Sequence, residues 1–137
     1  MRWERRLITI LGAALSGPSD TSSFQLAPAL QDLITKARSF GARIEELTPD
    51  RVVAAFGFDP IEDGPRRASN SAAAMLKALE RTEEGSAPLL TGRFAIHTGQ
   101  YLIARVSDVT GMDANDRRRA WSILDELVGK AEPDTIG

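Results

Sequence analysis

The chain has 137 residues, of which 42% are hydrophobic and 26% charged, with a formal net charge of -2 and a pI of about 5.4. These values are ordinary for a globular domain and exclude a disordered chain. The acidic balance argues against a nucleic-acid binder, because such proteins neutralise phosphates with Lys and Arg. The absence of cysteine excludes disulfides and thiolate metal sites, so we expect a cytoplasmic protein. No apolar run approaches the roughly 20 residues that span a bilayer, so we expect no membrane insertion by this segment.

The first part of the chain predicts a strand followed by a helix. Residues 7–11 form a short β-prone run after a charged lead, which indicates a strand, and the Gly-Pro-Ser-Asp sequence at 17–20 breaks it. Apolar residues then recur at helical spacing, which predicts a helix over residues 26–40 with Pro28 in its first turn. Gly41 follows as a natural stop for this helix.

A β-hairpin and a second helix are predicted next. Two short runs, residues 43–47 and 51–56, flank a tight polar Thr-Pro-Asp link, which is typical of a hairpin. The second helix begins near Pro65, a residue suited to a first turn, and its apolar stripe continues to Leu79. A polar linker is expected at residues 83–88.

The last part of the chain predicts two strands and a third helix. The strands are residues 93–97 and 101–106, separated by a turn at 98–100, and the helix covers about 114–129. The resulting order is β-α-β-β-α-β-β-α. This is a ferredoxin-like pattern, an α+β fold with a split βαβ unit and helices on one face of a mainly antiparallel sheet. We expect a single domain over residues 1–137.

Short motifs occur in a fixed order along nearly the whole chain. Residues 4–11 read E-R-R-L-I-T-I-L, and residues 50–57 read D-R-V-V-A-A-F-G. Residues 96–99 read I-H-T-G, and Asn115 with Arg119 forms an N-x-x-x-R pair at the start of a predicted helix. Together these motifs resemble the catalytic domains of class III adenylyl/guanylyl cyclases, in a degenerate form. The resemblance implies a cyclase homology fold, shortened before the third helix.

The resemblance also implies a chemistry and the residues that would perform it. In the family, two Asp residues hold two Mg²⁺ ions, which stabilise phosphoryl charge while the ribose 3′-hydroxyl attacks the α-phosphorus. The first of these positions falls at Ala14, which has no ligand oxygen, and the second at Asp50. The ribose-orienting Asn and the charge-stabilising Arg correspond to Asn115 and Arg119, which are present. Asp50 is therefore a vestigial metal position, and Asn115 and Arg119 are vestigial catalytic positions.

Other positions of the family pattern are altered. The base-reading Lys falls at Glu46, which reverses the charge, and the second base-reading position falls near Met112. The glycines beside the second Asp have become Pro49 and Arg51, which predicts a remodelled turn. Pro18 replaces a residue whose backbone N–H could help to hold phosphate.

Each candidate residue also has a structural interpretation. Asp50, next to a proline, is either a lone metal ligand or a turn residue. Asn115 is a ribose contact or, as we favour, an N-cap, and Arg119 has either an anionic partner or a solvated position. His97, the single histidine, indicates a packed or hydrogen-bonded residue rather than a catalytic one. Trp121 lies either at a dimer surface or in the core.

These observations give one main hypothesis and two alternatives. The main hypothesis is a catalytically degenerate cyclase-like domain that acts as a dimerisation or regulatory module in bacterial signal transduction. In this hypothesis the segment is a fragment of a larger protein that also contains a serine/threonine kinase or an ATPase. No cofactor is expected, with Mg or Mn needed only for residual activity. The expected partner is a second copy or another cyclase-like domain, and not nucleic acid. The alternatives are an active or heterodimer-complemented cyclase acting on ATP or GTP, and a nucleotide-binding sensor without turnover.

Overall fold

The structure is a computed structural model that describes residues 2–18, 21–59, 61–83 and 90–135. In chain order the elements are β1 (Trp3–Ser16), α1 (Ser23–Ser39), β2 (Arg43–Thr48), β3 (Arg51–Phe56), α2 (Gly64–Glu83), β4 (Thr91–Val106), β5 (Val109–Met112) and α3 (Ala114–Lys130). This order is the predicted β-α-β-β-α-β-β-α. Most of the linker expected at residues 83–88, together with residues 19 and 20 of the predicted break, lies outside the described residues.

The strands form one antiparallel sheet in the order β2-β3-β1-β4-β5. β3 lies between β1 and β2, and β1 lies between β3 and β4, so the first four strands with α1 and α2 form the split βαβ arrangement of a ferredoxin-like core. The predicted α+β fold class is therefore confirmed. The short strand β5 extends the sheet beside the far end of β4.

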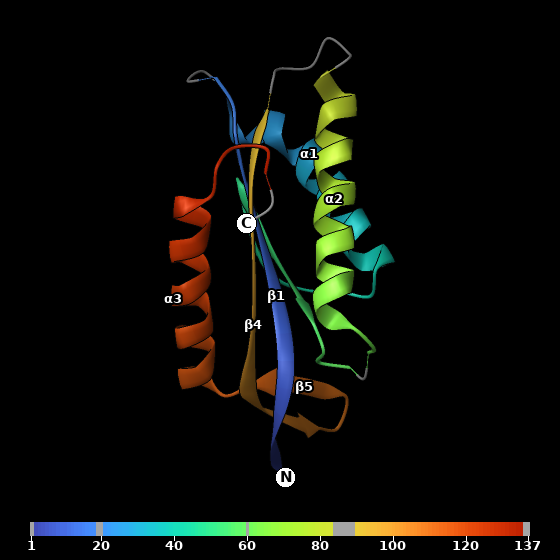
Figure 1. The fold of residues 1–137 in the computed structure, drawn as a ribbon, viewed down its shortest axis with the longest axis vertical. Coiled ribbons are helices and arrows are strands. Elements are labelled where there is room, and N and C mark those ends of the chain that lie inside the picture. The colour runs from blue at the N-terminus through green and yellow to red at the C-terminus, as the bar shows by residue number, and fades with distance from the viewer. Residues whose placement is uncertain (1, 19–20, 60, 84–89, 136–137) are drawn as a thin grey trace.

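The helices cover both faces of the sheet (Figure 1). α1 and α2 pack on the face that includes Leu11, while α3 packs on the face that includes Ile10. The prediction that all helices lie on one face is wrong for α3. The sheet accepts α3 closely at Gly12, because a Cβ atom there would lie 3.1 Å from side-chain atoms of both Leu124 and Val128.

Helix α1 begins earlier than its apolar spacing predicts. Ser22 is its N-cap and forms a capping box with Gln25, whose side chain accepts a hydrogen bond from the Ser22 N–H at 2.7 Å. Pro28 therefore lies inside the helix and not in its first turn. Its ring removes one intrahelical hydrogen bond to the carbonyl of Phe24. Because Phe24 is highly exposed, that part of the helix lies at the surface, where water can hydrate the carbonyl.

Strand β4 is continuous where a turn was predicted at residues 98–100. It pairs with β1 without a break from Thr91, opposite Ser16, to Ala104, opposite Trp3. Gly99 serves packing within this strand, because a Cβ there would lie 2.8 Å from the Tyr101 hydroxyl. The chain reverses instead after Val106 and pairs back as β5.

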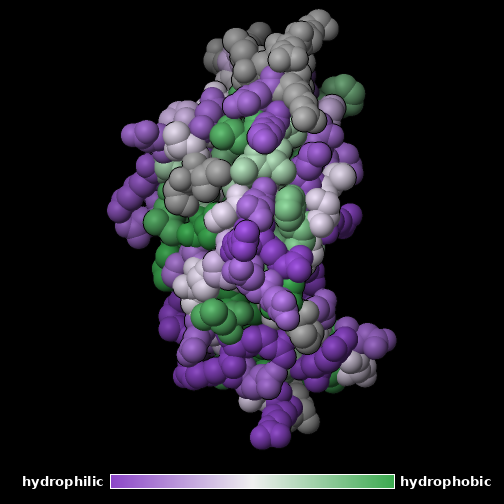
Figure 2. Space-filling view, turned by 45° about the vertical axis from the view of Figure 1, so that its right-hand side comes forward, coloured by the Kyte–Doolittle hydropathy of each residue, from purple (hydrophilic) through white to green (hydrophobic). Residues whose placement is uncertain are grey.

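One face of the molecule is mainly polar. Hydrophilic side chains predominate on the face shown in Figure 2, and hydrophobic side chains gather there in separate groups. No helix in the described ranges is long and apolar enough to cross a membrane.

Candidate functional site

The end of β1 and the β2–β3 turn lie side by side. The backbone N–H of Leu15 donates to the carbonyl of Asp50 at 2.7 Å, and Ala14 is directly opposite Arg51 in the β1–β3 register. The two positions that would carry metal-binding Asp residues in a cyclase are therefore neighbours in space. The fold keeps the geometry of the predicted pair even though one of the two carboxylates is absent.

The oxygen atoms that could bind a cation at this place belong to the β2–β3 turn. Asp50 is exposed, and its Oδ1 accepts a hydrogen bond from the Thr48 hydroxyl at 3.0 Å. Ala14 contributes only a methyl group, which packs against the core on the α3 face. Within the described ranges, no group of three or more His, Cys, Asp or Glu residues could hold a metal ion.

A fixed positive charge lies beside Ala14. Arg51 points to the same face of the sheet as Ala14, and its side chain is 19% exposed. Its Nη2 lies 2.5 Å from Oδ1 of Asp125 in α3, and its Nε lies 3.8 Å from Oε2 of Glu46 in β2. A guanidinium held in this position repels a cation. The residues present therefore do not fit a two-metal centre.

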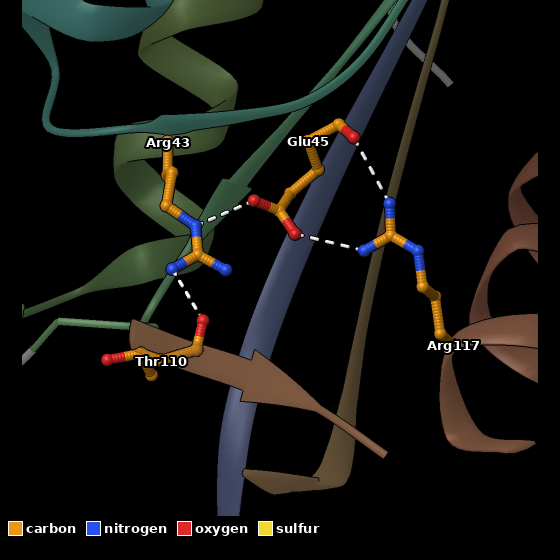
Figure 3. Close-up of polar contacts among 4 residues, drawn as sticks. All are labelled: Arg43, Glu45, Thr110 and Arg117. Carbon is orange, nitrogen blue, oxygen red and sulfur yellow. Dashed lines mark hydrogen bonds and ion pairs between the residues drawn. The ribbon is translucent and has the colours of Figure 1, made fainter. Parts of the chain in front are cut away.

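A second network of charges occupies the same face closer to β5 (Figure 3). Glu45, whose side chain is 11% exposed, accepts from Arg43 Nε at 2.6 Å and from Arg117 Nη1 at 2.9 Å. Arg117 Nη2 also donates to the backbone carbonyl of Glu45 at 3.1 Å, and Arg43 Nη1 donates to the carbonyl of Thr110 at 2.8 Å. These bonds connect β2 with β5 and α3.

Both arginines of this network also lie over aromatic rings. The Arg43 guanidinium carbon is 3.9 Å from the ring centroid of Phe58, and that of Arg117 is 4.1 Å from the centroid of Trp121. Stacking of this kind adds to the ion pairs when the groups are partly desolvated. Trp121 is half-buried against the α3-side core. Sequence analysis missed Glu45, because its partner Arg117 lies in α3, 72 residues further along the chain.

The two predicted base-reading positions have different surroundings. Glu46 is half-buried beside Arg51, and Met112 is half-buried in β5 against the α3-side core. Neither presents an unpaired polar side chain that could select a nucleobase by hydrogen bonding.

The start of α3 holds the remaining candidates. The N-cap is Asp113, whose side chain accepts from the backbone N–H of Asp116 at 3.2 Å, so the interpretation of Asn115 as the cap is wrong. Asp113 precedes the first helical residue and can therefore reach the free N–H groups. Asn115 is exposed, and its side-chain oxygen accepts from Arg118. Arg119 has an anionic partner, because it pairs with Asp116.

Asp116 is a buried carboxylate that sequence analysis did not single out. Its Oδ2 accepts a hydrogen bond from the backbone N–H of Leu102 at 2.7 Å, and its Oδ1 accepts from Arg119. The Leu102 hydrogen bond, followed by the bond and charge of Arg119 and the charge of Arg5, holds the pKa of Asp116 below its ordinary value. Asp116 therefore fixes α3 to the edge of β4.

Asn115 and Arg119 lie far from Asp50 within one chain. Leu102, which bonds to Asp116 at the start of α3, is opposite Arg5 in the β1–β4 pairing. Asp50 lies beside Ala14 near the other end of β1. At about 3.3 Å per residue, this separation along β1 is roughly 30 Å. A single chain therefore does not bring the predicted catalytic and metal positions together.

His97 occupies a structural position in the sheet. Its Nε2 lies 2.8 Å from the hydroxyl of Tyr101, so the two side chains share a hydrogen bond. Burial raises the pKa of Tyr101, while the charge of Arg119 opposes this shift. The hydrogen bond agrees with the structural interpretation of the single histidine.

Comparisons with known proteins reveal a shared fold. Neither a protein-family model nor a curated protein matches the sequence. The structure is similar to the adenylyl cyclase CyaB from P. aeruginosa, with a TM-score of 0.72, 18% identity and coverage of 99% of this chain and 78% of that chain. It is also similar to the guanylyl cyclase domain of the RhoGC fusion protein from the aquatic fungus Blastocladiella emersonii, with a TM-score of 0.73, 13% identity and coverage of 99% and 82%. For an adenylate/guanylate cyclase/hydrolase from Silicibacter pomeroyi the TM-score is 0.66, with 21% identity and coverage of 97% and 75%. The chain therefore has the fold of the class III adenylyl/guanylyl cyclase catalytic domains, which makes it a nucleotidyl-cyclase-like domain in structure.

Proposed function

We propose that this domain is a catalytically degenerate relative of the nucleotidyl cyclases and acts as a dimerisation or regulatory module. The observation that carries the proposal is the Arg51 guanidinium, which is paired with Asp125 and lies directly across from Ala14. A cyclase needs two carboxylates and two cations at this place. Here one carboxylate is replaced by a methyl group, and the neighbouring charge is positive.

The proposed setting is a cytoplasmic signalling protein of a bacterium, in which the domain serves a serine/threonine kinase or an ATPase. This part of the proposal rests on the family resemblance alone, since the run at residues 4–11 is similar to that of many bacterial cyclase domains and the domain as a whole resembles those fused to such kinases and ATPases. The domain would work without a metal cofactor, since Glu46 and Asp125 near Ala14 pair with Arg51 and the Asp50 carboxylate belongs to a turn, where it accepts from Thr48.

Dimer formation is proposed on geometric grounds. Asn115 and Arg119 face solvent at one end of α3, far from Asp50, so only a second chain could bring the two groups together. The similar guanylyl cyclase domain of RhoGC from Blastocladiella emersonii has been solved as a monomer and as a non-canonical dimer, and the guanylate cyclase domain from Catenaria anguillulae was solved in complex with GTP. The partner is a second copy or another cyclase-like domain.

An activity assay tests the loss of catalysis. Purified protein is incubated with ATP or GTP and Mg²⁺ or Mn²⁺, and cyclic nucleotide is separated and measured, with Asp50→Ala as the matched variant. We expect no product above a heat-denatured control in either protein. Turnover that Asp50→Ala abolishes would sink the proposal and establish an active cyclase.

Two further measurements separate the remaining functions. Sedimentation at several protein concentrations is expected to show a dimer, and a monomer at every concentration counts against the module. Calorimetry with ATP and GTP at millimolar concentration is expected to show no saturable heat. Saturable binding without turnover would replace the proposed module with a nucleotide sensor.

A further inference from the structure

A cavity of about 290 Å³ lies on the α3-side face of the sheet, at the end where β1 begins and β5 pairs with β4 (Figure 1). Its lining includes Glu4 and Arg6 of β1, Arg105 of β4 and Thr110 of β5. The register explains why these side chains meet, since Arg105 is opposite Thr110 and residues two apart on a strand share a face. Along β1, the cavity is roughly 30 Å from Ala14.

The cavity is positively charged, although the whole chain has a net charge of -2. In its lining, Arg6 and Arg105 outweigh the carboxylate of Glu4 by one charge. The network of Figure 3 reaches the same cavity at Thr110 and holds two guanidinium groups against one carboxylate, which adds a second excess charge. Arg2 also lines the cavity, but the excess does not depend on it. A cavity of this sign attracts an anion.

The two lining arginines differ in how they are held. Arg6 Nη1 donates to the carbonyl of Phe58 at 2.6 Å, and its Nη2 pairs with Glu4, so its guanidinium is fixed. Arg105 is exposed and has no hydrogen bond or ion pair within the described ranges. A fixed guanidinium loses little freedom when it binds a ligand, and an unpaired one has all its N–H groups available.

Thr110 gives an independent indication of a ligand. The residue is only 7% exposed, and its side-chain hydroxyl has no hydrogen-bond partner among the described residues. Its carbonyl accepts from Arg43, whereas its other oxygen points away from the drawn network (Figure 3). A buried hydroxyl without a partner lowers stability, so this one is suited to bond to a group that enters the cavity.

We propose that this cavity binds the phosphate group of a small phosphomonoester. Arg6 and Arg105 would pair with the phosphate oxygens, and the Thr110 hydroxyl would donate to one of them. The two excess positive charges match the charge of about -1.5 to -2 that such a group carries near neutral pH. Glu4, whose side chain is 59% exposed, can turn to solvent when the anion pairs with Arg6.

The size of the cavity limits the ligand. It is at the lower end of the range for small-molecule pockets, which favours a ligand well below the size of a nucleoside triphosphate. The site does not rest on the proposed loss of catalysis, because it lies at the other end of β1 from Ala14.

An NMR titration with two matched probes tests the proposal. Methyl phosphate and methyl sulfate have similar sizes, but at about pH 8 only the phosphate is a dianion. At millimolar methyl phosphate and low ionic strength, we expect saturable shifts of the Arg105 and Thr110 amide signals. We expect affinity about fivefold or more above that for methyl sulfate, and a decrease as salt is added. Equal affinity for both probes, or no saturable shift, would overturn the proposal.

Four variants locate the binding. Arg105→Gln is expected to weaken methyl phosphate binding about fivefold or more, and Thr110→Val, which removes only the hydroxyl, about threefold. Glu4→Gln is expected to strengthen binding, because it removes the competing carboxylate. Arg66→Gln, which changes an exposed arginine of α2, is the control and should leave binding unchanged. Unchanged affinity in both Arg105→Gln and Thr110→Val, or an equal loss in Arg66→Gln, would contradict the assigned site.

Discussion

Arg117 of α3 donates two hydrogen bonds to Glu45 of β2, one to its carboxylate at 2.9 Å and one to its backbone carbonyl at 3.1 Å. The pair bridges a strand at one edge of the sheet and the helix that covers its centre. Arg43 on the other side of the same carboxylate makes Glu45 the single anion between two guanidinium groups. This arrangement makes Glu45 the residue on which the network depends.

Glu45→Gln should therefore destabilise the fold. The amide keeps the shape but leaves Arg43 and Arg117 without their counter-charge. We expect a loss of about 2 kcal/mol in the free energy of unfolding, less than for a fully buried pair because both arginines are partly exposed. Urea unfolding measures this loss of free energy, and we expect the m-value to be unchanged. Glu126→Gln, which breaks the exposed pair with Lys130, is the control, and an equal loss in both variants would contradict the assigned importance of Glu45.

Asp116→Asn should change how stability depends on pH. The folded-state pKa of Asp116 is lowered from its ordinary value of 3.8, so its contribution is fully present above that value and is lost as pH falls through the folded pKa. We expect the variant to be about 1–2 kcal/mol less stable above about pH 5, with the deficit shrinking in acid. Unfolding free energies from pH 7 down to acid measure this. A deficit that stays constant with pH would show that the charge of Asp116 does not matter.

Tyr101 should ionise at a higher pH than a tyrosine in the unfolded chain. It is the single tyrosine, so tyrosinate absorbance reports it alone. Burial raises its pKa above the ordinary 10.0, so we expect a midpoint above that value in the folded protein and near it after unfolding in guanidinium. Because the neutral form is favoured in the fold, stability should decrease as pH rises past that value, and Tyr101→Phe should decrease less. A folded midpoint at or below 10.0 would contradict this environment.

Gly12→Val should disturb the contact between β1 and α3. Even a Cβ would lie 3.1 Å from side-chain atoms of Leu124 and Val128, and valine adds two more carbons. Overpacking of this kind costs about 1–3 kcal/mol, and thermal unfolding followed by circular dichroism measures it. Gly111→Val is the matched control in β5, where nothing lies within 4 Å of an added Cβ. Equal shifts in both variants would mean that α3 has room to move.

Metal binding should need two changes at the β1–β3 pair. Ala14→Asp combined with Arg51→Gly places a carboxylate near Asp50 and removes the guanidinium. We expect this double variant to bind Mn²⁺ with saturation in paramagnetic resonance titrations, while the unmodified protein and Ala14→Asp alone do not. Ala14→Asn with Arg51→Gly controls for side-chain volume. Binding by Ala14→Asp alone, equal to that of the double variant, would show that Arg51 does not oppose the cation.

The elements with strong local signals were predictable from the sequence. The hairpin of β2 and β3 and the span of α3 follow from residue spacing alone, with boundaries within a residue of those observed. The ferredoxin-like core follows from the order of these elements. The family resemblance assigned Ala14 and Asp50 to the two metal positions, and the β1–β3 pairing places these residues close together.

The misses come from contacts between distant parts of the chain. The turn predicted at residues 98–100 does not form because β1 pairs with β4 continuously from Thr91 to Ala104, which no local pattern shows. The position of α3 depends on burial of both faces of β1, where residues from Ile8 to Ala13 are all buried. In the sequence, this burial is indicated by the nearly continuous apolar run of β1. Asp113 took the N-cap in place of Asn115, because both types cap well and the pairing of β5 decides where the helix begins.

The pairing of Ala14 with Arg51 also limits how this domain can change over time. An aspartate gained at Ala14 alone would meet the Arg51 guanidinium across the strands and form an ion pair with it. A change at Arg51 alone would leave Asp125 and Glu46 without their cation. The first step leaves the new carboxylate paired with Arg51, and the second leaves Ala14 without a ligand oxygen, so neither alone gives a pair of carboxylates free of the guanidinium. The two positions therefore depend on each other, and a cation site at this place needs changes at both.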